Sequence, residues 1–113
     1  MYTVPHSLLR AKSGEPVKIT FTISDQNGNP VTVTGAAATY KIARRLGLPA
    51  LLTKTQSDGI TLSGSTAIVE FDTGGLVENN EALLGDFVAQ LKIIRNGDAL
   101  VVAEGPLQVE PVI

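Results

Sequence analysis

Apolar and polar residues alternate one by one in several short stretches of the chain. The clearest stretch is residues 17–23, where Val, Ile and Phe take every second position and Lys and Thr stand between them. A period of two is typical of a strand with one face in a core and the other in solvent. Similar patterns predict further strands at 36–43, 51–55, 60–62, 67–71, 87–93 and 100–109.

Turn-forming residues separate these stretches. Residues 25–30 read DQNGNP, a run rich in residues that tolerate positive φ or fix a turn. The pair Asn96-Gly97 suits a type I′ hairpin, in which both central residues have positive φ. Gly105-Pro106 predicts a bulge or a break in an edge strand, because proline has no N–H to give to a ladder.

The alternation stops between residues 72 and 85. Apolar residues there are interspersed with Glu78 and Glu81 and are followed by Gly85, which predicts one or two helical turns over 76–84. The rest of the chain shows no sustained helical period.

Seven or eight short strands with turns between them predict an all-β fold, and specifically an immunoglobulin-like antiparallel β-sandwich. A length of 113 residues suits one domain with its own core. We assign residues 14–113 to the sandwich and residues 1–13 to an N-terminal arm or a first edge strand.

The composition narrows the classes of function. Hydrophobic residues make up 43% of the chain and charged residues 18%, which argues against intrinsic disorder. The net charge of −2 with scattered basic residues argues against nucleic acid as a partner. No apolar run reaches the length of about 20 residues that crosses a bilayer, so we expect no membrane contact. The absence of cysteine excludes disulfides, thiolate metal sites and thiol catalysis.

Candidate catalytic groups are few. His6 is the single histidine and stands in an N-terminal stretch that we expect to be mobile, and the chain has no G-x-S-x-G elbow. The carboxylate pairs Glu70 with Asp72 and Glu78 with Glu81 fit solvated strand faces and loop ends better than acid–base chemistry. We therefore predict no catalytic residue and no enzyme.

Two segments test for a bound ion or cofactor. Residues 25–36 begin like a calcium loop, but Pro30 stands where that loop needs Gly and Ala36 where it needs a bidentate Glu. Residues 73–76 read TGGL, with no Lys placed to reach a phosphate. Both segments are interpreted as turns or loops, and neither a metal site nor a cofactor site is predicted.

The loop at 44–50 is the candidate contact site. It contains Gly47 and Pro49, and it overlaps the only local basic cluster of the chain, Lys41, Arg44 and Arg45. Leucines in a loop cost free energy unless the core or a partner covers them, and both readings stay open. The residues that we single out for protein contact are Arg44, Arg45, Leu46 and Leu48.

Turn and strand segments between residues 14 and 111 carry a family resemblance. The segments are DQNGNPV at 25–31, TGA at 34–36 followed by ATYKI at 38–42, SDGITL at 57–62, LGDF at 84–87 and VAEGPLQV at 102–109. In this order they resemble the immunoglobulin-like domains of tailed-phage and prophage structural proteins, and are similar to the N-terminal domain of phage baseplate upper proteins. The first segment also resembles the repeated modules of invasin-type bacterial adhesins.

The phage resemblance implies a non-catalytic virion or tail assembly protein. Its expected partners are further copies of itself, as a homo-oligomer, or other phage structural proteins, and its expected location is the virion, after assembly in the bacterial cytoplasm. Baseplate upper proteins carry a receptor-binding-protein anchor after this domain, whereas the sequence here ends at Ile113, so a small head, neck or tail accessory protein fits equally. The alternative is an adhesin-type module that binds carbohydrate or a cell surface.

Overall fold

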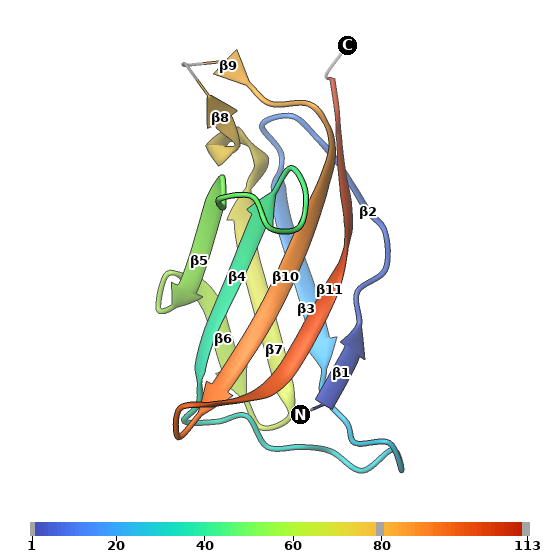
Figure 1. Cartoon of the computed structure of the whole chain (residues 1–113), viewed down its shortest axis with the longest axis vertical. Helices are drawn as coiled ribbons and strands as arrows, with labels where there is room; N and C mark the ends of the chain where they lie inside the picture. Colours follow the sequence, from blue (N-terminus) through green and yellow to red (C-terminus); the bar gives the residue numbers. More distant parts are fainter. Residues whose placement is uncertain (1, 79–80, 112–113) are drawn as a thin grey trace.

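The alternating stretches of the sequence form the strands of an elongated all-β molecule, with principal extents of 43 × 24 × 24 Å (Figure 1). The structure is a computed structural model, and it describes residues 2–78 and 81–111. Its main strands are β1 (Tyr2–Pro5), β2 (Leu9–Lys12), β3 (Pro16–Thr22), β4 (Ala37–Ala43), β5 (Leu52–Gln56), β6 (Gly59–Ser63), β7 (Thr66–Asp72), β10 (Gly85–Arg95) and β11 (Asp98–Glu110).

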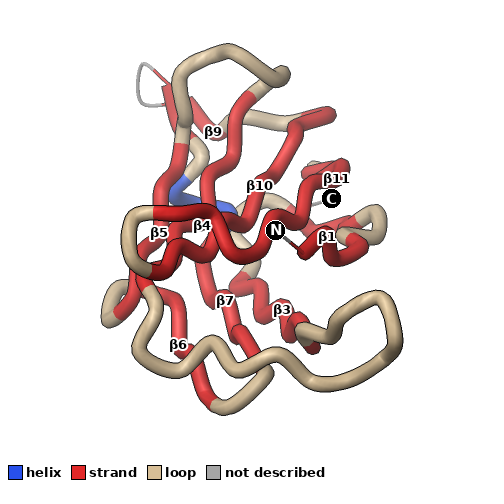
Figure 2. Tube along the Cα trace, turned by 60° about the horizontal axis from the view of Figure 1, so that its bottom comes forward, coloured by secondary structure: helices blue, strands red, loops and turns tan. Residues whose placement is uncertain are grey.

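These strands form two layers. Along the hydrogen-bonded path the order is β1, β11, β10, β4, β5, β6, β7, β3, and β2 also pairs with β11. Strands β1, β2, β11, β10, β4 and β5 make one layer, and β6, β7 and β3 make the other (Figure 2). The layers are joined where Thr55 pairs with Gly59 and Gln56 with Ile60. The architecture is thus a sandwich that comes close to a barrel, which confirms the predicted all-β sandwich.

The core lies between the layers and is built by the alternate residues that point inward. Tyr40, Ile42, Leu91 and Ile93 are all fully buried, and they come from the two neighbouring strands β4 and β10. Aromatic rings are few but gathered, since the Tyr40 ring lies 5.8 Å from that of Phe71. Large aliphatic side chains therefore fill most of the core, as expected from the scarcity of aromatic residues.

Three strand pairings are parallel, so the prediction of a purely antiparallel sandwich was wrong in this respect. β1 and β2 both run parallel to β11, and β5 runs parallel to β6. β1 and β2 are far from β11 in the sequence, as is usual for parallel neighbours, whereas Ser57 and Asp58 alone join β5 to β6, which pair at only two positions. The pattern of single strands cannot reveal such pairings, because it records which face is buried and not which strand lies alongside.

The helical turns predicted for 76–84 are not found in its described residues, 76–78 and 81–84, four of which form strands. A short 3₁₀ turn, η1 (Thr73–Gly75), comes earlier, where the Asp72 carboxylate accepts a hydrogen bond of 2.7 Å from the N–H of Gly74. Two short strands follow, β8 (Val77–Glu78) and β9 (Glu81–Ala82), which pair with each other. The N–H of Leu83 bonds to the carbonyl of Leu76, so a hairpin satisfies the backbone there in place of a helix.

The last hairpin forms as predicted. Asn96 and Gly97 have φ of 53° and 83°, the positive values that a type I′ turn requires. β11 then continues through Gly105 and Pro106 with unbroken pairing to β10, and the one register shift lies at Ile93. The predicted bulge or break at 105–106 was therefore wrong for β11 itself.

The interruption falls instead on the neighbouring strand. β1 ends at Pro5 and β2 begins at Leu9, so three residues of the N-terminal segment lie opposite Gly105 and Pro106. Because proline has no amide hydrogen, a break in the neighbouring ladder at this point loses little. Gly105 is required there, since a methyl group would collide with the carbonyl oxygen of His6 and lie 2.8 Å from its Nδ1.

Candidate protein-contact face

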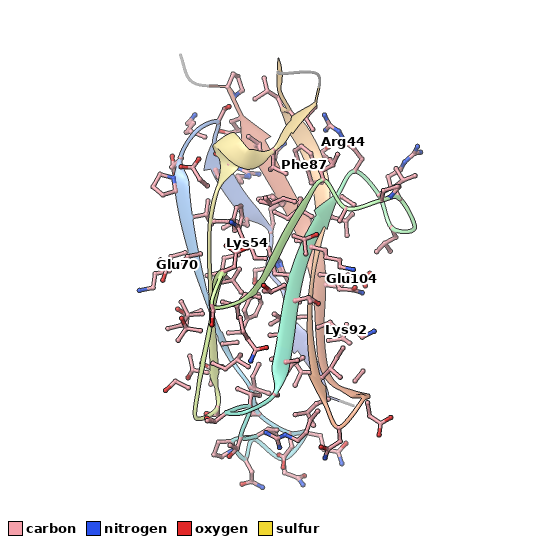
Figure 3. The ribbon with its side chains drawn as sticks, turned by 90° about the vertical axis from the view of Figure 1, so that its left-hand side faces the viewer. Arg44, Lys54, Glu70, Phe87, Lys92 and Glu104 are labelled. Atoms are coloured by element: carbon pink, nitrogen blue, oxygen red, sulfur yellow. The ribbon has the colours of Figure 1, made fainter. Side chains whose placement is uncertain are left out.

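The outward side of β4, β10 and β11, together with the loop at 44–51, forms what we call the contact face. Val88, Ile94 and Val102 lie on it by strand alternation, are half-buried, and stand outside the core cluster. Lys92 and Glu104 project from the same side of the molecule, and Glu70 projects from the opposite layer (Figure 3). Apolar side chains are thus presented on a surface that the core does not need.

Two rows of register partners cross the middle of the contact face. In the first row Gln90 lies between Lys41 on β4 and Glu104 on β11. The Gln90 amide donates a hydrogen bond of 3.1 Å to the Glu104 carboxylate. In the second row Val88 lies between Ala43 and Pro106. The face therefore has a basic side on β4, an acidic side on β11 and an apolar row beside them.

The loop at 44–51 overhangs the β4 side of this face. The N–H of Leu51 bonds to the carbonyl of Ile42 at 2.7 Å, which fixes the loop at its end. Leu46 and Leu48 are 63% and 45% exposed, so the structure places both at the surface. Between the loop and the sheet is a hollow of about 270 Å³, whose lining includes Lys41, Ala43, Arg45, Leu46, Leu48, Val88 and Gln90.

Arg44 differs from the other three residues singled out in this loop. It is half-buried, and its guanidinium donates hydrogen bonds to the carbonyl of Leu84 at 2.8 Å and to that of Asp86 at 3.3 Å. The same group lies 4.3 Å from the centre of the Phe87 ring, a cation–π contact (Figure 3). Arg44 thus ties the loop to the start of β10, while Arg45 is exposed.

Lys41 and Arg45 make the hollow electropositive. Both are exposed, and among the side chains that the structure describes neither forms an ion pair. Two cations beside exposed leucines favour an occupant that combines an anionic group with an apolar one. A surface of this kind can bind protein.

His6 does not lie in a mobile arm, contrary to the expectation from the sequence. It is 9% exposed and lies between β1 and β2. Its Nε2 is 2.8 Å from the Tyr40 hydroxyl and its Nδ1 is 3.0 Å from the carbonyl of Ser7. Since that carbonyl can only accept, Nδ1 donates to it and Nε2 accepts from the hydroxyl. Both nitrogens are occupied in holding the N-terminal strands to the core.

Tyr40 is the residue that sequence reasoning missed as a partner of His6. It is fully buried, and burial raises the pKa of its hydroxyl well above the ordinary value. A buried tyrosine normally finds a hydrogen-bond partner. The inward position of Tyr40 in its strand indicates that its hydroxyl has a partner. It does not indicate that this partner lies 34 residues earlier in the chain.

The carboxylates considered as candidates in the sequence do not come together in one described site. One oxygen of Asp25 accepts hydrogen bonds from the N–H groups of Asn27 and Asn29, both at 2.9 Å, so this carboxylate shapes the predicted turn. Glu70 is exposed on β7, and Asp72 caps η1. The side chains of Glu78 and Glu81 lie outside the described ones. Among those described, no group of three histidine or acidic side chains could hold a metal ion.

Comparisons with known proteins add the following. No protein-family profile matches the chain, and no curated protein matches it. Among solved structures, the chain is similar to part of a protein from Bacteroides vulgatus ATCC 8482 that is provisionally named a glycoside hydrolase, with 12% identity and a TM-score of 0.49. The match covers 93% of this chain and spans 17% of that one. No helix in the described part of the chain has the length and apolarity that crossing a membrane requires.

Proposed function

We propose that this chain is a non-catalytic assembly protein of a phage or prophage virion or tail, and that it acts through protein–protein contacts. The observation that carries the contact role is the contact face, which presents apolar residues beside an electropositive hollow. The phage context is supported by the resemblance of the turn and strand segments between residues 14 and 111.

The opposite layer supports this reading by contrast. On the outward side of β7, Ile68 has two threonines as its register partners, Thr20 and Thr61. Val88 on β10 has Ala43 and Pro106 in the corresponding places. One outer face is thus built for water and the other carries apolar rows, as expected if only one of them is covered in an assembly.

The proposal includes no chemical step. His6, the single histidine, has both ring nitrogens engaged in hydrogen bonds within the fold. Glu70 and Asp72, the described acidic pair, project from a strand face and cap a turn. A hydrolytic site would need a free histidine or a pair of carboxylates, and the placement of these three side chains favours structural roles instead.

Purification of particles from the source cells tests this function. After induction, mass spectrometry of density-purified virions should detect the chain at a fixed ratio to the other structural proteins. V88E should abolish incorporation, because it buries a charge at the contact. I68E, the matched change on the opposite layer, should leave incorporation unchanged. Virions of normal composition and infectivity that lack the protein would contradict the proposal.

A further inference from the structure

We propose that the contact face binds the same face of a second copy of this chain, in a pair whose two-fold axis runs parallel to β10. This inference rests on the proposed contact function and names its partner. Its basis is that the two sides of the face, on β4 and on β11, carry opposite charges, and that the β4 side has a hollow where the β11 side exposes an apolar ring.

The β4 side is concave and basic. The hollow under the loop has Ala43 and Val88 on its floor and Lys41 and Arg45 among its lining. The β11 side is acidic, since Glu104 is exposed on that strand, and the apolar ring of Pro106 is exposed two residues further on. One side therefore has a hole with a cationic lining, and the other has an apolar ring beside a carboxylate.

The register places these features at matching heights. Lys41 and Glu104 belong to the row that passes through Gln90, and Ala43 and Pro106 belong to the row through Val88. β4 and β11 flank β10 on either side, each about 4.8 Å away. A rotation of 180° about an axis parallel to β10 exchanges the two sides and keeps the rows at the same height.

In such a pair Glu104 of the second copy faces Lys41, and Pro106 of the second copy faces Ala43 and the hollow. The two Val88 side chains meet near the axis. Each contact occurs twice, as an isologous pair requires. Sheets that pack face to face also tolerate an angle of about 30° between their strands, so the match needs no perfect alignment.

An axis perpendicular to β10 is disfavoured. It would place the basic side of one copy against the basic side of the other, so Lys41 would face a second Lys41. The parallel axis has one repulsive feature of its own, because Lys92 lies on β10 and projects outward (Figure 3). Its ammonium group would lie near that of the second copy, so removing this charge should strengthen the pair.

Sedimentation of the purified full chain from about 1 to about 500 µM, where a weak pair would appear, tests the inference. The natural chain should show a reversible monomer–dimer equilibrium. K41E and E104K should each weaken it by about tenfold, because each places like charges together at two symmetric sites. K92Q should strengthen it by a few-fold. Thermal melts check that every variant stays folded.

The decisive arm combines the two charge changes. The double variant K41E/E104K should recover most of the natural affinity, because the charges are exchanged and remain complementary. An equimolar mixture of the two single variants should form mixed dimers more tightly than either forms its own. V88E should abolish pairing, and I68E should not change it.

Three outcomes would overturn the inference: a chain that stays monomeric throughout this range, dimers that ignore V88E, or charge variants without recovery in the double variant. These outcomes are separable from failure of the proposed function. If virions take up the natural chain and exclude V88E while the isolated chain is monomeric, the contact face binds a different protein, and only the self-pairing is wrong.

Discussion

The two outer faces of the sandwich follow the same alternation but use different residues. On the layer of β3, β6 and β7, threonines surround Ile68, and Lys18 on β3 is the register partner of Glu70 on β7. On the layer of β4, β10 and β11, Lys41 and Glu104 lie two strands apart with Gln90 between them.

In the middle of the first face the opposite charges of Lys18 and Glu70 are direct register partners, whereas in the middle of the second Lys41 and Glu104 are held apart beside apolar rows. A face of the second kind is unfavourable for a molecule that stays alone in water, and favourable for one that is covered. The comparison therefore separates the buried residues, which the fold requires, from the outward apolar residues, which an assembly would use.

The largest loss of stability is expected on the buried side of β10, the central strand of the contact face. Leu91 on β10 is fully buried, so Leu91→Ala should lower the free energy of unfolding by about 2–5 kcal/mol. Val88→Ala, three residues away on the outward side, should lower it by less than about 1 kcal/mol. Urea denaturation at low micromolar concentration measures both. If both variants lost the same free energy of unfolding, Val88 would belong to the core, and the two outer faces would no longer differ in this respect.

A smaller effect is expected at the edge of the same layer. Gly105→Ala forces a methyl group against the backbone of His6, so it should cost about 1–3 kcal/mol and loosen β2. Hydrogen exchange should show protection lost first at residues 9–12. Gly64→Ala is the control, because Gly64 has open space around its Cα and a φ of 58°. It should cost about 1 kcal/mol without a local change at β2.

The smallest effect concerns the loop that overhangs the contact face. Arg44→Ala removes two hydrogen bonds to carbonyl groups and the contact with Phe87, and it should cost about 1 kcal/mol. Faster hydrogen exchange at 44–51 would report the loosened loop. Arg45→Ala, in the exposed neighbour, should leave this exchange unchanged. If both variants behave alike, Arg44 is not the anchor of the loop.

Local features of the sequence predicted much of this fold. Alternation placed the strand at 17–23, and Asn96-Gly97 fixed the last hairpin, because a type I′ turn depends on these two residues alone. The sequence left open whether the core covers Leu46 and Leu48, and the structure places both at the surface.

Distant partners could not be predicted in the same way. His6 finds Tyr40 only because β1 and β2 lie along β11, and nothing near residue 6 encodes that pairing. Arg44 was singled out as a candidate contact residue, yet its partners Leu84 and Asp86 come from a segment about 40 residues later. The contact face itself depends on knowing which strands are neighbours, which is a property of the topology.

The parallel pairing of β1 and β2 with β11 also has a mechanical consequence. β1 begins near one end of the long axis and β11 finishes near the other (Figure 1). A force that pulls the ends apart therefore slides β11 past its neighbours in shear, and all pairs of the two ladders resist together instead of opening one after another. His6, held to Tyr40 between the two ladders, would share this load.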